Sequence, residues 1–276
     1  MNHESVNDIR LVQHQLVPTG LNQYRPIEVC CDGSKRSVPA LHGITSTYSS
    51  CVEQPIQRLF FALITTLKGY LIYGGDAKDA YAHSPPPSVP TFVSIDDQYA
   101  DWYEWKFGTK LDRKKVLPVQ HALQGHPESG KLWERTINKV LRCSRLNFQT
   151  TVHDRTVYWT TFRGVKVYLL RQVDDFALAS PSEDIAKEIF QIIGEELKFA
   201  KEDKIPLEYL GLLDDFNGVK VQQSAENVVL SSEGYIERVL RTHEWETPSR
   251  ADPSPNRCVP FSPDTLTQIY KDFDPQ

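Results

Sequence analysis

The chain of 276 residues has no long apolar run and no recognisable leader segment. A membrane-spanning helix needs about 18 or more consecutive apolar residues, and no such run occurs. The N-terminus reads Met-Asn-His-Glu-Ser-Val-Asn-Asp, without the cationic and apolar stretches of a secretory signal peptide. These two absences predict an intracellular protein with no membrane partner.

Cysteine is also scarce. The five cysteines are scattered and odd in number, which favours free thiols in a reducing compartment over a disulfide framework. None of them has the spacing of a zinc site, the eight histidines form no HExxH-like pair, and no internal repeat is visible. The cysteines are Cys30, Cys31, Cys51, Cys143 and Cys258.

The chain also lacks a strong overall charge. Its net charge of −5 and its 40% apolar and 24% charged residues are ordinary for a globular protein of one large or two small domains. The cations are unevenly distributed, however, because ten of them and only three acids lie between Lys106 and Arg145. This stretch is either a solvated helix face or a surface that follows phosphates.

The segment from Val165 to Ala179 is central to the interpretation. Apolar strand-forming residues flank the adjacent carboxylates of Asp174 and Asp175 on both sides, which predicts a β-hairpin with the acids at its tip. The pairs Asp96-Asp97 and Asp214-Asp215 lack such flanks and are typical of solvated loops and turns. Adjacent half-buried carboxylates repel each other, and a divalent cation such as Mg²⁺ or Mn²⁺ compensates that repulsion well.

A third carboxylate follows an earlier predicted strand. Tyr70 to Tyr73 has strand character, Gly74-Gly75 permits a bend or a close approach of the backbone, and Asp76 comes directly afterwards. Asp76 is either a functional acid at a strand end or a plain helix N-cap. If it meets the acid pair at one sheet edge, the trio suits two metal ions about 3.5–4 Å apart.

The remaining pattern favours an α+β fold with an antiparallel sheet, because its strand pairs read as hairpins. A buried core helix is expected between Val52 and Gly69, with Gly69 as its C-cap. Three further helices are expected. One buries Trp133, Ile137, Val140 and Leu141, and a second begins at Ser182 and has an isoleucine-rich apolar stripe. A third begins at Ser232, with Tyr235, Ile236, Val239 and Leu240 pointing inward. The expected hairpins span residues 157–170, 165–179 and 207–221, and residues 91–95 read as a strand.

Four motifs in order resemble the reverse transcriptase domain of copia-type retrotransposon polyproteins, over roughly residues 30–245. Each motif alone is weak, and their order and spacing make the resemblance specific. They are Asp76-Ala77-Lys78-Asp79-Ala80-Tyr81, Ala122-Leu123-Gln124-Gly125 through Leu132-Trp133, Gln172-Val173-Asp174-Asp175, and Glu208-Tyr209-Leu210-Gly211. The third departs from the family's Tyr-X-Asp-Asp box, since Gln172 stands where a tyrosine is usual.

The resemblance implies a right-hand polymerase with fingers, an antiparallel palm sheet with helices, and a partial thumb. It places an N-terminal extension at residues 1–29, the fingers and palm at 30–231, the start of the thumb at 232–246 and a loose tail at 247–276. The chain contains no integrase, protease or ribonuclease H pattern. It is therefore expected to be a fragment of a polyprotein, a relic or an excised domain.

The resemblance also implies roles for individual residues. Asp76 and Asp174 are expected to be the main ligands of two Mg²⁺ or Mn²⁺ ions and Asp175 a weaker one, since adjacent strand residues point to opposite faces. Lys204 stands where a catalytic lysine protonates pyrophosphate. Tyr81 is expected to lie under the sugar and to exclude a 2′-hydroxyl. The expected nucleotide contacts are Gln124, Gly125, Lys35 and Arg36, and the expected nucleic-acid contacts are Lys131, Arg135, Lys139 and Gln172.

The implied activity is RNA-directed DNA polymerisation, with an RNA or DNA template, its primer and dNTPs as partners. Other parts of a polyprotein, such as an integrase or a ribonuclease H, are further expected partners, in a cytoplasmic retroelement particle or in the nucleus. Two alternatives stay open: a catalytically silent relic that only binds nucleic acid, and a metal-dependent phosphohydrolase that uses the same acids. The second leaves Tyr81 and the Gln124-Gly125 loop unexplained.

Overall fold

The computed structural model describes residues 49–95, 97–198, 205–224 and 227–242, together with three short strands nearer the N-terminus, β1 (Asp8–Ile9), β2 (Leu11–Val12) and β3 (Cys30–Cys31). The chain divides into two compact units, residues 1–230 and 231–276. Within the described ranges, no helix has the length and apolar character needed to cross a membrane. The expected site residues Lys35, Arg36 and Lys204 lie outside the described residues.

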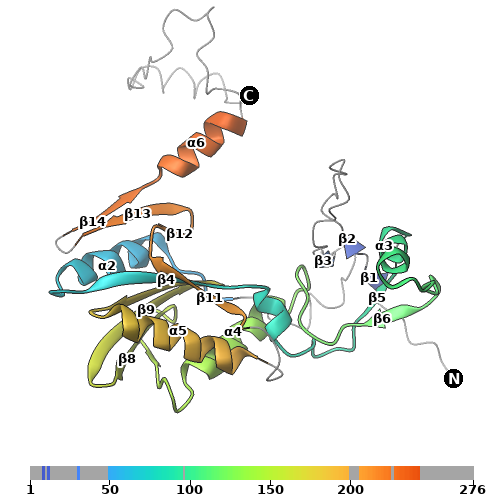
Figure 1. The fold of residues 1–276 in the computed structure, drawn as a ribbon, viewed down its shortest axis with the longest axis horizontal. Helices are drawn as coiled ribbons and strands as arrows, with labels where there is room; N and C mark the ends of the chain where they lie inside the picture. Colours follow the sequence, from blue (N-terminus) through green and yellow to red (C-terminus); the bar gives the residue numbers. More distant parts are fainter. Residues whose placement is uncertain are drawn as a thin grey trace, which may run out of the picture. The chain divides into compact units, whose positions relative to one another are not determined.

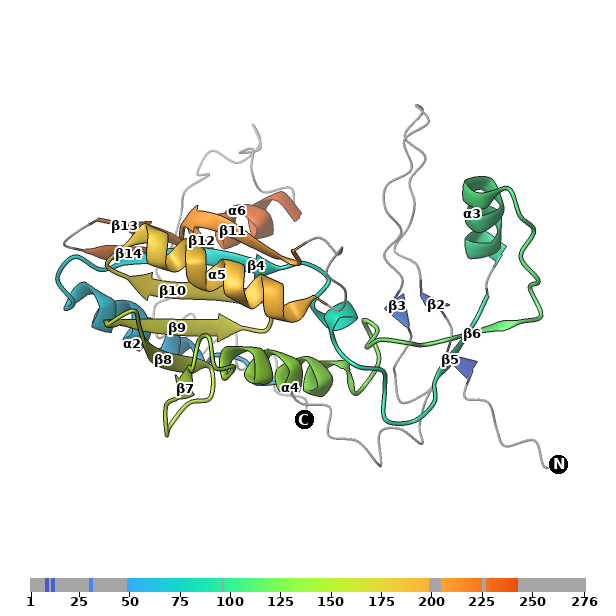
Figure 2. The same cartoon turned by 60° about the horizontal axis from the view of Figure 1, so that its bottom comes forward.

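The first unit is built on a six-stranded antiparallel sheet with the strand order β11-β4-β10-β9-β8-β7 (Figures 1 and 2). Its strands are far apart in the sequence, so the sheet joins segments separated by more than a hundred residues. The fold is a mixture of helices and antiparallel sheet, as the hairpin pattern predicts. The strands are β4 (Leu71–Ala77), β7 (Gln149–Thr150), β8 (Val157–Phe162), β9 (Val165–Gln172), β10 (Asp175–Ser180) and β11 (Leu207–Leu212).

Two hairpins of this sheet confirm the sequence prediction. Strands β8 and β9 turn at Arg163-Gly164, where both residues have positive φ angles of 49° and 79°. Such angles are typical of the two-residue turns whose twist matches that of the flanking strands. Strands β9 and β10 then pair through Gln172 and Asp175, which places Val173 and Asp174 in the connecting turn.

Helices cover the two faces of the sheet, with α2 (Gln54–Thr65) on one side and α4 (Ser129–Leu141) and α5 (Glu183–Leu197) on the other (Figures 1 and 2). The alternation of side chains along the strands produces these two layers. In β4, Tyr73 belongs to the core beneath α4 and α5, whereas Ile72 belongs to the core beneath α2. In β10, Phe176 and Ala177 divide in the same way.

Helices α4 and α5 follow the predicted periodicity. In α4, Trp133, Ile137, Val140 and Leu141 are all buried. Helix α5 begins after Ser182, and Glu183 and Asp184 occupy its first turn, where negative charge is favourable. Its buried stripe contains Ile189, Ile192, Ile193 and Leu197 together with Ala186 and Phe190.

The prediction for the first helix is partly wrong. Helix α2 ends at Thr65, not at Gly69, and its Leu59 and Leu63 are 63% and 43% exposed. The hydroxyls of Thr65 and Thr66 donate to the carbonyl oxygens of Ala62 and Leu63, each at 2.7 Å. Threonine hydroxyls that bond to the preceding turn compete with continuation of the helix. Gly69, with φ of 80°, lies in the turn beyond the helix.

The expected hairpin over residues 207–221 is also wrong. Strand β11 is instead an edge strand of the large sheet and pairs with β4, with a bulge between Tyr209 and Gly211. Gly211 has a φ of 83°, which glycine adopts without steric penalty. The hairpin at Asn217-Gly218 forms between β12 (Asp215–Phe216) and β13 (Val219–Gln223), in a small sheet with β14 (Val228–Ser231).

Other described elements complete the chain. Strand β5 (Phe92–Ser94) confirms the strand expected at 91–95, and it pairs with β1 and β6 (Val116–Pro118). Helix α3 (Asp97–Phe107) was not predicted. A 3-10 turn, η1 (Ala80–His83), follows β4. In the second unit, α6 (Glu233–Thr242) has no fully buried residue. The inward orientation expected for Tyr235 and Ile236 is wrong, because they are 62% and 55% exposed, whereas Val239 and Leu240 are partly buried.

The glycine before Asp76 provides a test of the packing beneath the sheet. A Cβ atom added at Gly75 lies 2.5 Å from Cε1 of Phe190, which is buried under β4. We expect Gly75→Ala to lower the free energy of unfolding by about 1–3 kcal/mol, the usual effect of overpacking, as measured by urea denaturation. Combining it with Phe190→Leu should restore part of that loss, whereas strictly additive effects of the two changes would contradict the contact.

Candidate active site

Two of the three candidate carboxylates lie directly opposite each other on neighbouring strands. Asp76 near the end of β4 pairs in register with Asp175 at the start of β10. Directly opposed residues of an antiparallel pair project to the same face, and here this is the face that carries Ile72 and Ala177. The structure therefore brings Asp76 and Asp175 together, although 98 intervening residues separate them in the sequence.

Asp174 reaches the same place from the turn. It lies between β9 and β10, outside both strands, so the strand alternation expected to separate it from Asp175 does not apply. The Asp174 backbone carbonyl accepts a hydrogen bond of 3.0 Å from the amide of Ala77, the residue that follows Asp76. This bond joins the turn to the end of β4.

The electrostatics of the three acids reflect this proximity. Burial raises the pKa of Asp76, and the charge of Asp174 raises it further, while Lys78 opposes the shift. Burial raises the pKa of Asp175 to about 6, with the charges of Asp174 and Asp76 as the next causes. A hydrogen bond from the Asn217 backbone opposes that shift. The acids thus form a site of concentrated negative charge at one end of the sheet.

The donor chemistry of this site suits Mg²⁺ or Mn²⁺, because carboxylate oxygens are their preferred protein ligands and the charges repel each other. Within the described ranges, no group of three or more histidine, cysteine or acidic side chains is assembled closely enough to hold a metal ion. Magnesium in nucleotide-processing sites is usually held by one or two carboxylates plus substrate phosphates. The residues present fit that mode and do not form a complete protein cage.

Two further acids adjoin the site, and the sequence analysis assigned neither of them to it. Glu208 on β11 pairs in register with Asp76 on its other side, and its carboxylate forms a 2.5 Å ion pair with Lys78. Asp215, in the hairpin of β12 and β13, lies close enough to raise the pKa of Asp175. Only the pairing of β11 with β4, which no local sequence signal encodes, places Glu208 there.

A cavity of about 470 Å³, which we call the Tyr81 cavity, borders the turn that carries Asp174, although none of the three carboxylates lines it. Its wall includes Tyr81 from η1, Gly125 from the loop before α4, and Val173 from the β9–β10 turn. Burial raises the pKa of the Tyr81 hydroxyl, and the charge of Asp174 adds to the effect, which indicates that the ring and the acid are close. The structure therefore places Tyr81 and Gly125 in the wall of one cavity, whereas Gln124 is exposed and does not line it.

Buried polar contacts fix the loop that carries Gly125. The Glu128 carboxylate is 7% exposed and accepts hydrogen bonds from the backbone amide and the hydroxyl of Ser88, at 2.9 and 2.7 Å. The His126 ring is 4% exposed, and its Nδ1 accepts from the amide of Glu128 at 3.2 Å. Burial lowers the pKa of His126, in agreement with the neutral ring that this bond requires. These contacts tie the loop before α4 to the proline-rich segment after η1.

The candidate nucleic-acid contacts share one surface. Lys131, Arg135 and Lys139 of α4 line a cavity of about 770 Å³ together with Arg142 and Arg155. Within the part of the chain that the structure describes, none of these five cations is paired with a carboxylate. We call these five residues the α4 basic surface. Its charge is therefore available to an anionic partner.

Gln172 does not lie on that surface. Its register with Asp175 places it on the carboxylate face of the sheet, where its side-chain oxygen accepts a 2.7 Å hydrogen bond from the Val52 amide. The glutamine at the usual tyrosine position thus holds the segment before α2 against β9.

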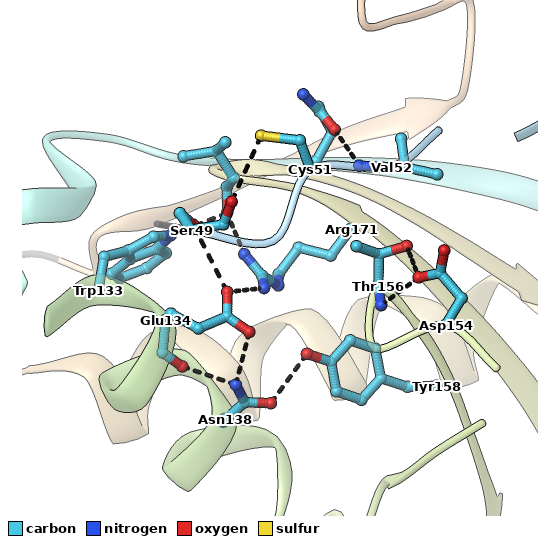
Figure 3. Close-up of polar contacts among 12 residues, drawn as sticks. Ser49, Cys51, Val52, Trp133, Glu134, Asn138, Asp154, Thr156, Tyr158 and Arg171 are labelled. Atoms are coloured by element: carbon cyan, nitrogen blue, oxygen red, sulfur yellow. Dashed lines mark hydrogen bonds and ion pairs between the residues drawn. The ribbon is translucent and has the colours of Figure 1, made fainter. Parts of the chain in front are cut away.

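A buried polar network that the sequence analysis missed lies on the opposite face of β9 (Figure 3). Arg171 is completely buried and forms an ion pair with Glu134 of α4. Trp133 of α4 and Arg171 both donate to the Val173 carbonyl, at 2.8 and 3.1 Å. The available signal was a charged residue directly after an apolar run, since Arg171 follows Val-Tyr-Leu-Leu.

Comparison with known proteins agrees with this arrangement. No curated protein matches the chain. A protein-family model described as reverse transcriptase (RNA-dependent DNA polymerase) matches residues 44–251, which include all three carboxylates, the Tyr81 cavity and the α4 basic surface. That match covers well over half of the sequence. The chain therefore belongs to the reverse transcriptase (RNA-dependent DNA polymerase) family.

Proposed function

We propose that the chain is the reverse transcriptase domain of a copia-type retroelement polyprotein and extends a DNA primer along an RNA template by two-metal nucleotidyl transfer. The observation that carries the proposal is the register of Asp76 with Asp175, with Asp174 in the adjoining turn beside the Tyr81 cavity. An acidic site next to a nucleotide-sized cavity is the arrangement that phosphoryl transfer from a triphosphate requires.

In this proposal the six-stranded sheet is the palm of a right-hand polymerase. The fingers and palm occupy residues 30–231, the thumb begins at 232–246, residues 1–29 are an extension and residues 247–276 a tail. The division of the chain between residues 230 and 231 supports the placement of the thumb boundary.

Asp76 and Asp174 are assigned as the main ligands of the two ions, and Asp175 as the weaker one. The ions, when bound, would activate the primer 3′-hydroxyl and neutralise charge on the triphosphate and on the departing pyrophosphate. The raised pKa values of Asp76 and Asp175 support this assignment, because burial and the neighbouring acids disfavour their negative charges, which a bound cation would compensate. The chain's own contribution is to hold the three acids at one end of the sheet.

The incoming dNTP is assigned to the Tyr81 cavity. Tyr81 would lie under the sugar, and Gly125 would border the nucleotide inside the cavity. Gln124 would approach the nucleotide from outside the cavity wall, and Lys35 and Arg36 would contact the triphosphate. Lys204 would protonate the pyrophosphate, and Gln172 would contact the primer strand through its position beside Asp175. The cavity wall formed by Tyr81, Gly125 and Val173 supports the first part of this assignment.

The α4 basic surface is assigned to the phosphates of the template and primer. Replacing Lys131, Arg135 and Lys139 with Ala should weaken template–primer binding and flatten its salt dependence, because fewer counterions are released. We expect the slope of log K against log salt to fall by roughly one unit for each phosphate that the variant no longer binds. A fluorescence-anisotropy titration at several salt concentrations measures this slope.

A matched triple variant separates local contacts from net charge. Arg113, Arg145 and Arg163 each pair with a carboxylate in the structure, so replacing these three with Ala removes the same charge elsewhere. This control should leave the salt slope close to that of the wild type. Equal flattening in both variants would show that the α4 basic surface is only a solvated helix face.

Primer extension on poly-rA with an oligo-dT primer tests the proposed activity. Mg²⁺-dependent incorporation of dTTP is the expected result. Tight template–primer binding without incorporation would instead indicate a silent relic, and release of phosphate without incorporation would indicate a phosphohydrolase. The polyprotein partners, such as an integrase or ribonuclease H, and a location in a retroelement particle or in the nucleus belong to the same proposal.

A further inference from the structure

The turn that carries Asp174 has an unfavourable backbone conformation. Val173 has a φ of 53°, and among the described residues it is the only β-branched one with a positive φ. A β-branched side chain in the left-handed region is a steric outlier that persists only where the surroundings enforce it. Some part of the structure must therefore hold Val173 in place.

Two buried donors meet at the carbonyl oxygen of Val173. Nε1 of Trp133 donates at 2.8 Å and Nη1 of Arg171 donates at 3.1 Å. Both side chains are 0% exposed, so water does not compete for these bonds. Trp133 belongs to α4 and Arg171 to β9, and the turn is thus held by two different elements.

The guanidinium of Arg171 is in turn oriented by α4. Its Nη2 forms the ion pair with Glu134, whose other carboxylate oxygen accepts a 2.8 Å hydrogen bond from Asn138 (Figure 3). The Asn138 side-chain oxygen accepts from the Tyr158 hydroxyl at 2.9 Å. A chain of polar contacts thus leads from β8 through α4 to the turn.

Stability alone does not explain a completely buried arginine in this apolar strand. Well-packed apolar residues often replace a buried ion pair without loss of stability, and Nε of Arg171 has no hydrogen-bond partner among the described residues. The pair also supplies a bond from Arg171 to the Val173 carbonyl, directly before Asp174. On the other side of the turn, the Asp174 carbonyl accepts the Ala77 amide at 3.0 Å.

We propose that Arg171 and Trp133 are positioning residues that hold the Val173–Asp174 turn against α4, with Glu134 orienting Arg171, and so fix Asp174 beside Asp76. Neither side chain reaches the carboxylate face itself, because Arg171 and Trp133 lie on the α4 side of the sheet. The effect on catalysis rests on the proposed polymerase function, whereas the effect on the turn does not.

The test compares three changes. Arg171→Met alone leaves Glu134 partly buried without its cation, so a loss of stability is expected and is not diagnostic. Arg171→Met combined with Glu134→Met removes both charges and should recover most of the melting temperature. Trp133→Phe keeps an aromatic ring and removes only the indole donor, so it tests the same bond without altering the ion pair.

Two readouts follow the turn, and one is independent of activity. The Ala77 amide reports the position of Asp174, because it donates to the Asp174 carbonyl. Its hydrogen exchange should become at least about tenfold faster both in the Arg171→Met/Glu134→Met variant and in Trp133→Phe. A tenfold change corresponds to about 1.36 kcal/mol of reduced protection. In primer extension, kcat should fall by at least about tenfold in both variants. The template–primer Kd should stay unchanged in Trp133→Phe, which leaves every charge of α4 in place, including Glu134 in the wall of the basic cavity.

Thr160→Val serves as the matched control. It removes a buried hydrogen bond of 2.9 Å to the Leu146 carbonyl in the same sheet, away from the turn. It should lower the melting temperature and leave Ala77 exchange and kcat at wild-type values. The proposal would be overturned if the Arg171→Met/Glu134→Met variant regained both the melting temperature and the Ala77 exchange rate of the wild type. If the wild type does not extend primers, the proposed function fails, and Ala77 exchange still decides the role of the network.

Discussion

Replacing Asp174 with Asn is expected to abolish Mg²⁺-dependent primer extension while the protein stays folded. An amide is a poor ligand for a hard cation, and the stabilisation of transferred charge by bound metal is worth several kcal/mol. At 1.36 kcal/mol for each factor of ten, extension should fall by more than about a thousandfold. Single-nucleotide incorporation under saturating template–primer measures the loss.

Folding should survive this change for an electrostatic reason. Asp174 is exposed, and its charge is the largest electrostatic contribution, after burial, to the raised pKa values of Asp76 and Asp175. Removing it relieves repulsion, so the melting temperature should be unchanged or slightly higher. Asp214, which is also exposed and belongs to another Asp-Asp pair, provides the control, and Asp214→Asn should leave extension intact. Near-normal extension by the Asp174→Asn variant would mean that its acid pair is only a turn.

Replacing Tyr81 with Ala is expected to relax the discrimination between ribonucleotides and deoxyribonucleotides. Tyr81 lines the cavity together with Gly125 and Val173, and in the proposed site its ring would meet a ribose 2′-hydroxyl and tolerate a deoxyribose. Specificity of this kind arises from a clash and needs no added attraction. A tenfold rise in the rNTP to dNTP incorporation ratio requires only about 1.4 kcal/mol, which one steric contact can supply.

The alternative is that Tyr81 is mainly a core aromatic, since one side of its ring packs against the core beneath α4 and α5. In that case Tyr81→Ala would lower the melting temperature and all activity together, with no shift in the incorporation ratio. Tyr81→Phe separates the two roles, because it keeps the ring and removes the hydroxyl. It should retain wild-type discrimination if steric exclusion is the mechanism.

Local patterns in the sequence predicted the elements around the site. The apolar spacing of Trp133, Ile137 and Leu141 predicted the buried face of α4, and the strand-forming residues of 157–170 predicted the pairing of β8 with β9. The apolar flanks of Asp174-Asp175 predicted the hairpin between β9 and β10. These features depend on residues close in sequence, where periodicity and turn chemistry are informative.

Contacts between distant segments were not predictable in the same way. The sequence does not specify which strand pairs with the edge of β4. For that reason the position of Glu208 beside Asp76 was not predicted, and β11 was assigned to the wrong hairpin. Strand alternation was applied to Asp174 although it lies in a turn. Helix α3 was missed because its aromatic residues, such as Trp102 and Trp105, do not form one apolar face.

The ion pair of the buried Arg171 was also not predictable from local sequence patterns. A charged residue after four strand-forming positions indicates a buried partner, but the sequence does not say that the partner is Glu134, 37 residues earlier. Only the packing of α4 on β9 joins them. The resemblance to a polymerase motif identified the acids of the turn and gave no information on what holds the turn.

Incorporation of labelled dTTP on poly-rA primed with oligo-dT, by the wild type and by the Asp76→Asn variant side by side, tests the central claim most directly. The wild type should extend the primer only when Mg²⁺ or Mn²⁺ is present, and Asp76→Asn should bind the same template–primer with similar affinity and not extend it. Equal incorporation by the two proteins, or none by a folded wild type that binds template–primer in either metal, would contradict a two-metal polymerase site at Asp76, Asp174 and Asp175.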